Sequence, residues 1–203
     1  DVIVDQNLVE KNDSRYETLV PQGARKLLGP AFALLRSEFH SVRQTTAPRS
    51  GIVRRLLVSM GGPDAANETS KVLEALQLLG QRAFEVDVVI GSASPHVAMI
   101  RRRCAAMSRT TLHCGVDNMA ELMGQADLAI GAGGTTTWER CCLGLPALVM
   151  IVATNQRDAT RALAKRRALI DLGDASALSA AALGENLANI ISDPGRLAAT
   201  SKN

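Results

Sequence analysis

Residues 127–152 read DLAIGAGGTTTWERCCLGLPALVMIV, and the fold class can be inferred from this segment. An apolar run over 127–132 leads into a pair of glycines, and a helical pattern follows over about 137–143. A second apolar run then covers 146–152. Two buried strands joined by a glycine turn and a short helix form a βαβ unit, in which the two strands are parallel.

The same alternation extends outward in both directions, over residues 54–191. The hydrophobic periodicity predicts strands at 55–60, 84–90, 110–113, 127–132, 146–152 and 168–170. It predicts helices at 67–79, 95–106, 118–123, 137–143, 156–165 and 177–191. Strands that alternate with helices in this way indicate an α/β fold, a doubly wound parallel sheet of the Rossmann-like type with helices on both faces.

The first fifty residues do not follow this series. Residues 1–5 predict one strand with nothing upstream to pair with, and a single strand cannot bury its faces. Residues 21–43 carry an apolar helical stretch, and residues 44–51 are typical of a polar linker. We therefore expect residues 1–50 to be the remnant of an N-terminal α/β domain plus its linker, and residues 51–203 to be the C-terminal domain. On this interpretation the chain is truncated at its N-terminus.

Composition excludes several classes of protein. Aromatic residues make up only 2% of the chain, so the core is aliphatic. The net charge of +3 comes from scattered basic clusters without aromatic neighbours, which argues against a nucleic-acid partner. No apolar run approaches the ~20 residues of a membrane span, so no membrane partner is expected. The four cysteines form no CxxC pair and predict small buried side chains in a reduced, cytoplasmic protein.

Two of the loops that follow predicted strands contain glycines suited to an anionic ligand. In an open parallel sheet, ligands bind beyond the carboxyl ends of the strands. The loop over 59–64 contains Gly61-Gly62, which let the backbone approach a phosphate, although a tight turn with Asp64 as helix N-cap explains it equally well. The loop over 131–139 offers three glycines and three threonine hydroxyls at a helix start, which is typical of a phosphate cradle.

The role of Glu139 is open from spacing. Thr136 and Glu139 have the spacing of a capping box, in which the glutamate only bonds the N-cap amide, and spacing alone favours that role. Two further loops are of interest. The one over 153–158 contains Asn155, which is equally explained as an N-cap, and the one over 115–119 enters a short helix where backbone groups can meet a nucleobase.

These motifs together resemble a known family. The matching segments, which run from the first residue to about residue 191, are Val4-Asp5-Gln6-Asn7, Leu27-Leu28-Gly29-Pro30, Ala33-Leu34-Leu35-Arg36, Ser59-Met60-Gly61-Gly62-Pro63-Asp64, residues 115–146 and Asn155-Gln156. They resemble the UDP-2,4-diacetamido-2,4,6-trideoxy-β-L-altropyranose hydrolases of pseudaminic acid biosynthesis. The run Gly-Gly-Thr-Thr-Thr-Trp-Glu-Arg-Cys-Cys over 133–142 is its most specific part. More distantly, the same stretch is similar to the peptidoglycan N-acetylglucosaminyltransferases, which share the GT-B architecture of two facing α/β domains.

The resemblance implies a UDP-sugar site in residues 51–203. It assigns Glu139 to the ribose hydroxyls, in addition to any capping role, and the backbone near Met119 to the uracil. The positions that it assigns to the diphosphate are Gly61, Gly62, Gly133, Gly134 and Thr135. The positions that it assigns to the sugar side of the cleft are Asn155 and Gln156. The implied reaction is hydrolysis at the anomeric carbon, which releases UDP and the free sugar without a metal or cofactor.

The chain departs from this family in one respect. The hydrolases carry an essential histidine in a glycine-rich loop of the N-terminal domain, and that segment is absent here. His40, His96 and His113 are predicted to be structural or solvated, so no catalytic residue is assigned to this chain. Its partners would be the UDP-sugar substrate and the missing N-terminal domain of the same enzyme. Two alternatives stay open, namely a GT-B glycosyltransferase that uses the same UDP site and a non-catalytic nucleotide-binding module.

Overall fold

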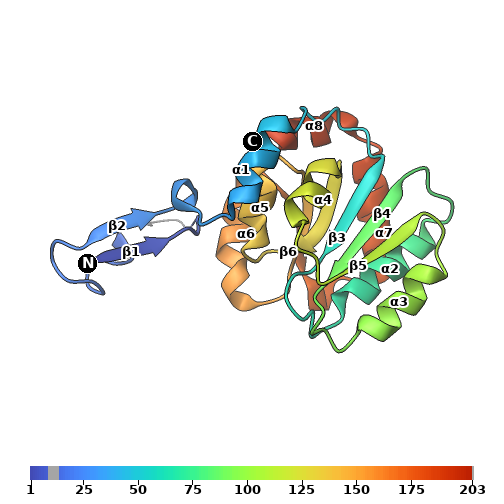
Figure 1. Cartoon of the computed structure of the whole chain (residues 1–203), viewed down its shortest axis with the longest axis horizontal. Helices are drawn as coiled ribbons and strands as arrows, with labels where there is room; N and C mark the ends of the chain where they lie inside the picture. The colour runs from blue at the N-terminus through green and yellow to red at the C-terminus, as the bar shows by residue number, and fades with distance from the viewer. Residues whose placement is uncertain (9–13, 203) are drawn as a thin grey trace.

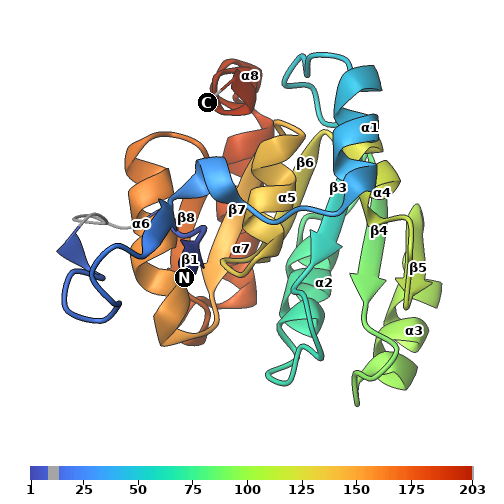
Figure 2. The same cartoon turned by 60° about the vertical axis from the view of Figure 1, so that its left-hand side comes forward.

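The computed structural model describes residues 1–8 and 14–202. Most of them form one α/β body with a central six-stranded sheet (Figures 1 and 2). The strand order is β5-β4-β3-β6-β7-β8, and every neighbouring pair is parallel, as predicted from the sequence. The strands are β3 (Arg55–Ser59), β4 (Glu85–Ile90), β5 (Thr110–Cys114), β6 (Leu128–Ala132), β7 (Ala147–Ile151) and β8 (Ile170–Asp174).

The order of the strands places the two glycine loops side by side. The chain runs outward from β3 through β4 to β5, and then returns to the other side of β3 as β6. In the β3–β6 register Ser59 pairs with Gly131, so the segments that follow these two strands leave the sheet at the same point. Reversal of the strand order between neighbouring strands is where open α/β sheets form their ligand crevice.

Helices cover both faces of the sheet (Figure 2). One face packs against α2 (Glu68–Leu78), α3 (Val97–Ala105) and α7 (Ala180–Ile191), and Leu73, Leu76 and Leu183 are completely buried there. The other face packs against α4 (Met119–Gln125), α5 (Thr136–Cys142) and α6 (Arg157–Lys165). Aliphatic strands buried on both faces explain why the apolar runs predicted the fold.

Residues just before the predicted domain boundary pack onto this body. Helix α1 (Ser37–Thr45) lies against α4 and α5, and its Phe39 is fully buried in their core. The Arg49 guanidinium donates to the carbonyls of Ala126 (2.8 Å), Met123 (2.9 Å) and Leu143, which lie at the ends of α4 and α5. These contacts fix α1 and the following segment to the C-terminal body.

A separate two-stranded unit precedes α1. Strand β1 (Val2–Asp5) pairs in parallel with β2 (Arg25–Leu28), and Figure 1 shows the pair standing apart from the body. The prediction that the first strand has no partner is therefore wrong. The short 3-10 helix η2 (Pro30–Phe32) follows β2.

Other boundaries also differ from the sequence prediction. Strand β8 covers 170–174 rather than 168–170, and helix α8 (Pro194–Lys202) was not predicted. The prediction of buried cysteines holds for Cys104, whereas Cys114 is exposed and Cys141 and Cys142 are half-buried; all four thiols are free. Two further 3-10 turns, η3 (Thr154–Gln156) and η4 (Ala175–Ala177), lead into α6 and α7.

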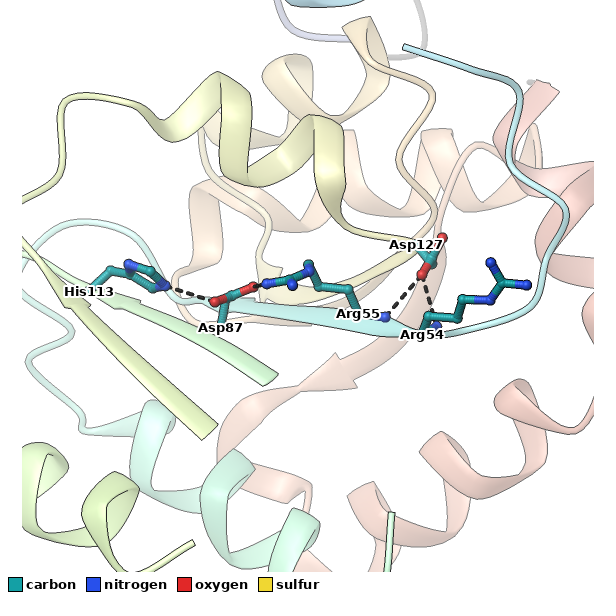
Figure 3. A network of polar contacts seen from close by, with 5 residues as sticks. All are labelled: Arg54, Arg55, Asp87, His113 and Asp127. Atoms are coloured by element: carbon teal, nitrogen blue, oxygen red, sulfur yellow. Dashed lines mark hydrogen bonds and ion pairs between the residues drawn. The ribbon is translucent and has the colours of Figure 1, made fainter. Parts of the chain in front are cut away.

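A polar network crosses β3, β4 and β5 (Figure 3). The buried Asp87 carboxylate accepts from Arg55 Nη1 at 2.7 Å and lies 2.7 Å from His113 Nε2. At the start of β3, Asp127 Oδ2 accepts from the backbone amides of Arg54 (2.8 Å) and Arg55 (2.9 Å). Because diagonal neighbours on adjacent strands interact in this way, the network holds the strands in register.

Candidate functional site

Three adjoining cavities lie along the carboxyl edge of the sheet. The first has a volume of about 590 Å³ and lies beyond β3, β4 and β5. Its walls come from the loops after these strands, from α5 and from the start of α1. The lining residues are Arg36, Ser59, Gly61, Gly62, Pro63, Val89, Ile90, Gly91, Ser92, Ala93, Gly115, Val116, Met119, Thr136 and Glu139. Its interior is therefore mainly apolar, with a carboxylate and a guanidinium at one side.

The second cavity, of about 400 Å³, lies between the loops that follow β3 and β6. It shares Gly61, Gly62, Pro63 and Thr136 with the first cavity, so the two adjoin. Its other lining residues are Met60, Asp64, Ala65, Ala66, Glu68, Ala132, Gly134, Thr135, Val152 and Gln156.

The third cavity, of about 470 Å³, lies between the β1 unit and the body. Its lining residues are Val4, Asp5, Gln6, Asn7, Leu34, Leu35, Thr135 and Glu139. Glu139 thus lines the first and third cavities, and Thr135 lines the second and third. The residues that belong to two cavities mark a continuous cleft.

The β3–α2 loop needs its glycines to form the wall between the first two cavities. Gly61 and Gly62 have φ angles of 72° and 43°, a region that residues with a Cβ rarely adopt. The neighbouring β4–α3 loop comes so close that a Cβ on Gly91 would lie 2.9 Å from the Gly62 carbonyl oxygen. Backbone rather than side chains therefore lines this part of the cleft.

The first amides of α2 are already occupied. Asp64 Oδ1 accepts from the Glu68 amide and Asp64 Oδ2 from the Thr69 amide, both at 2.9 Å, although the residue before the helix is Asn67. The alternative interpretation of Asp64 is thus correct in that its carboxylate caps the first amides of α2, although the N-cap position itself is Asn67. A ligand phosphate in the second cavity has to use other donors than these two amides.

The capping-box prediction for Glu139 is wrong. Helix α5 starts at Thr136, which is the first helical residue and not the N-cap, and no side chain caps this end. The Glu139 carboxylate instead faces the cleft, where its Oε1 accepts from Arg36 Nη2 at 3.4 Å. The spacing was misleading because the glycine loop shifts the helix start by one residue, which turns Glu139 away from the N-cap amide.

Two of the predicted site residues do not line any of these three cavities. Gly133 lies under α6, where an added Cβ would be 2.3 Å from Thr160 Oγ1, so its small size serves packing. Asn155 is exposed within the 3-10 turn before α6. Its neighbour Gln156 does line the second cavity, where its Oε1 accepts from the Val152 amide at 3.1 Å.

The remaining predicted site residues are brought together from distant loops. Those that line the cleft are Gly61, Gly62, Met119, Gly134, Thr135, Glu139 and Gln156. Sequence analysis missed two others. Arg36 lies in a segment that carries no local ligand-binding pattern, and Ser92 follows β4 in a short glycine-serine loop.

The three histidines lie outside the cleft-lining sets. His113 pairs with Asp87 in the sheet network, His96 Nε2 lies 3.2 Å from the Ala65 carbonyl, and His40 Nε2 lies 3.0 Å from Gln44. Within residues 1–8 and 14–202, no three His, Cys, Asp or Glu side chains are grouped to hold a metal ion. Over the same ranges, no helix has the length and apolar character to cross a bilayer.

Comparisons with known proteins agree with this architecture. Over 162 residues the chain is 33% identical to the spore coat polysaccharide biosynthesis protein SpsG of Bacillus subtilis, covering 79% of this chain and 48% of SpsG. MurG of Acinetobacter baumannii superposes with a TM-score of 0.62 at 16% identity, covering 98% of this chain and 54% of MurG. The spinosyn rhamnosyltransferase SpnG in complex with thymidine diphosphate superposes with a TM-score of 0.56 at 22% identity, covering 77% of this chain and 41% of SpnG.

The chain spans about half the length of SpsG and of MurG. The superpositions show the GT-B type of Rossmann-like domain, as the sequence resemblance implied. Residues 56–203 match the family described as the glycosyltransferase family 28 C-terminal domain. This match covers the six-stranded sheet and both sets of helices, and the chain therefore belongs to the glycosyltransferase family 28 C-terminal domain family.

Proposed function

We propose that this chain is the nucleotide-sugar-binding half of a two-domain GT-B glycosyltransferase that uses a UDP-sugar. The observation that carries the proposal is the continuous cleft at the carboxyl edge of the sheet, in which an apolar cavity with one carboxylate adjoins a cavity walled by glycine backbone. The spinosyn rhamnosyltransferase of the same fold binds thymidine diphosphate. A pyrimidine nucleoside diphosphate therefore fits the class of ligand.

The nucleoside would occupy the first cavity. Val116 and Met119 offer apolar contact to a pyrimidine ring, and the backbone after β5 offers hydrogen bonds to its edge. Glu139 lines the same cavity, and its carboxylate would accept from the two ribose hydroxyls. The Arg36 side chain, which now donates to Glu139, would have to share that carboxylate with the ribose.

The diphosphate would cross from the first cavity to the second. Gly61 and Gly62 line both, and Gly134 and Thr135 line the second, so backbone amides and a hydroxyl would surround the phosphates. The sugar would then lie toward Gln156. Gly133 takes no direct part in this arrangement, since it is enclosed by Thr160 and Gln156.

In the transfer reaction, the bond between the anomeric carbon and the diphosphate oxygen breaks. UDP leaves with the electron pair while an acceptor hydroxyl bonds to the carbon and loses its proton to a base. Our assignment gives this chain the task of binding and orienting UDP, and we propose that the base and the acceptor site belong to the other domain. Stabilisation of the leaving diphosphate is the catalytic contribution expected from this half.

Hydrolysis of the UDP-sugar is the second candidate. It is favoured by the Gly-Gly-Thr-Thr-Thr-Trp-Glu-Arg-Cys-Cys run over 133–142, which resembles the hydrolases of pseudaminic acid biosynthesis. In hydrolysis, water replaces the acceptor hydroxyl, and the UDP-sugar would bind at the same UDP site. The two reactions are distinguished with the two-domain protein, because a hydrolase releases UDP and free sugar at full rate without any acceptor.

We further propose that residues 1–50 contain part of that other domain. The β1–β2 unit exposes Val2 and Val4, with 62% and 42% of their surfaces accessible, as strands that belong in a larger sheet would do. A preceding domain attached there would face the third cavity and close over the bound nucleotide.

The binding proposal is tested by calorimetry with UDP, CMP and ADP, with and without Mg²⁺. We expect weak binding of UDP that needs no metal, because the contacts from the closing domain are missing. Equal binding of the three nucleotides, or strict dependence on a metal, would count against the assignment.

A further inference from the structure

The side chain of Arg140 is buried directly behind the second cavity. It is 3% exposed, and its Nη2 donates to the Ala132 carbonyl at 2.7 Å and to Thr137 Oγ1 at 2.9 Å. Ala132 itself lines the second cavity, so the guanidinium lies one hydrogen bond from the cavity wall. Burial lowers the pKa of Arg140 to about 10, against the opposing influence of Cys141 and Glu139, and the side chain is therefore charged at neutral pH.

This charge has no acidic partner. Among the residues that the structure describes, no carboxylate lies within 4.0 Å of the Arg140 guanidinium, and its Nε makes no hydrogen bond. A buried cation held only by neutral acceptors is unfavourable for folding unless something else compensates it. The fold nevertheless makes room for it, because a Cβ on Gly131 would lie 2.2 Å from Arg140 Nη1.

Among the described residues, no cation lines the second cavity. The charged residues in this lining are Asp64 and Glu68. Glu68 Oε2 is paired with Lys71 Nζ at 2.6 Å, whereas the two oxygens of Asp64 accept from the first two amides of α2 and so point toward the helix. Arg140 is a buried cation next to this cavity that takes part in no ion pair among the described residues, and the sign of its charge favours an anion.

We propose that Arg140 is a positioning residue for the diphosphate, whose negative charge it attracts through the wall of the second cavity without touching it. The proposal rests on the proposed function, because it takes the diphosphate to lie between the first and second cavities. The Arg140 guanidinium and a diphosphate on the other side of the cavity wall would interact because the protein between them has a low effective dielectric constant and contains little water to screen the charges. A buried charge also keeps its place when the ligand leaves, so no reorganisation is needed when the ligand binds.

The test compares UDP with uridine, which lacks the phosphates, in titrations of the full chain. Arg140→Gln removes the charge and retains an amide N–H for the Ala132 carbonyl, and Arg140→Met removes a buried charge while keeping an unbranched stem. In whichever neutral variant folds, as judged by circular dichroism, we expect UDP affinity to fall about tenfold or more while uridine affinity changes less than about twofold. Arg140→Lys retains the charge and should restore most of the UDP affinity.

The matched control is Arg49→Gln. Arg49 is a half-buried arginine that is likewise held by carbonyls, but it binds the far ends of α4 and α5, at the opposite edge of the sheet from the cleft. That variant should lower stability and leave the ratio of UDP to uridine affinity unchanged. If the neutral Arg140 variants weaken UDP and uridine by the same factor, Arg140 only shapes the β6–α5 loop and the inference is wrong. If the unaltered chain binds neither ligand, the proposed function fails instead.

Discussion

Arg36 Nη2 lies 3.4 Å from Glu139 Oε1, and this ion pair joins the start of α1 to the middle of α5. The same guanidinium lies 3.1 Å from Glu38, and half of the Arg36 side chain is exposed to solvent. Solvent-exposed pairs contribute only about 0–1 kcal/mol to folding because water and salt screen them. The position of Glu139 in the cleft therefore has little to do with the stability of the fold.

Glu139→Gln should accordingly leave the melting temperature almost unchanged and weaken UDP binding. The amide retains the size of the side chain but loses the charge that would accept from the ribose hydroxyls. We expect UDP affinity to fall about tenfold or more, equivalent to ~1.4 kcal/mol, as measured by calorimetry. A variant that loses stability yet binds UDP normally would show that Glu139 is structural.

Thr136→Ala serves as the stability control for that experiment. Because Thr136 is the first helical residue and caps nothing, its replacement should change the free energy of unfolding by less than ~0.5 kcal/mol. A capping threonine would instead cost ~1 kcal/mol when replaced by alanine. Urea denaturation separates the two values, and a loss near the larger one would restore the capping interpretation.

Arg49→Ala should destabilise the body strongly. Its loss leaves the carbonyls of Met123, Ala126 and Leu143 without their donor, and a buried polar group without a partner costs about 1–3 kcal/mol. We expect the urea midpoint to fall with an unchanged slope. Arg101→Ala, at an exposed position on α3, is the comparison and should stay within ~0.5 kcal/mol of the unaltered chain.

Tyr16 reports on the β1–β2 unit because it is the single tyrosine in the chain. Its hydroxyl donates to Asp5 Oδ2 at 2.7 Å, and this bond, with burial and the Asp5 charge, raises the tyrosine pKa above its usual 10.0. The stabilisation is therefore present below pH 10.0 and is lost as pH rises through the folded pKa. Ultraviolet titration should find a midpoint above 10.0 that Asp5→Asn lowers; an identical midpoint in both proteins would show that the bond is absent in solution.

Asp5 should give the opposite dependence at acid pH. Burial alone would raise the pKa of Asp5, but hydrogen bonds from Tyr16 and Asn7 and the charge of Arg15 outweigh it and lower that pKa below 3.8. The contribution of Asp5 to stability is therefore complete above the unfolded pKa and is lost as pH falls through the folded one. Amides of β1 and β2 should exchange faster in Asp5→Asn than in the unaltered protein at pH 6, while those of β6 stay the same.

The sequence predicted the body well because its four central strands, β3, β4, β6 and β7, are buried on both faces. Runs such as 128–132 and 147–151 are aliphatic throughout and leave no other assignment. It failed for β2, whose Arg25-Lys26-Leu27-Leu28 has no β-branched residue and is followed by Gly-Pro. It also misplaced β8, an edge strand of mixed polarity whose residues are all half-buried.

The site was predicted from loops and missed where it depends on tertiary contacts. Gly61, Gly62 and Gly134 follow strands directly, so their position at the carboxyl edge follows from the fold class. Arg36 reaches the cleft from a segment more than a hundred residues before Glu139, and no local sequence pattern predicts the contact between these two side chains. Gly133 resembles its neighbour Gly134 in sequence, and only the packing of α6 separates their roles.

The anchoring of α1 also determines where the molecule can bend. Phe39 and Arg49 fix the chain to the body on both sides of Thr45, so the polar stretch predicted as a linker cannot serve as a pivot. The only backbone without helix or strand between η2 and α1 is residues 33–36. A rotation of the β1–β2 unit relative to the body would therefore be taken up within residues 33–36, and Arg36 at the end of this segment is paired with Glu139 in the cleft. Movement of the β1–β2 unit would therefore change the distance between Arg36 and the Glu139 carboxylate.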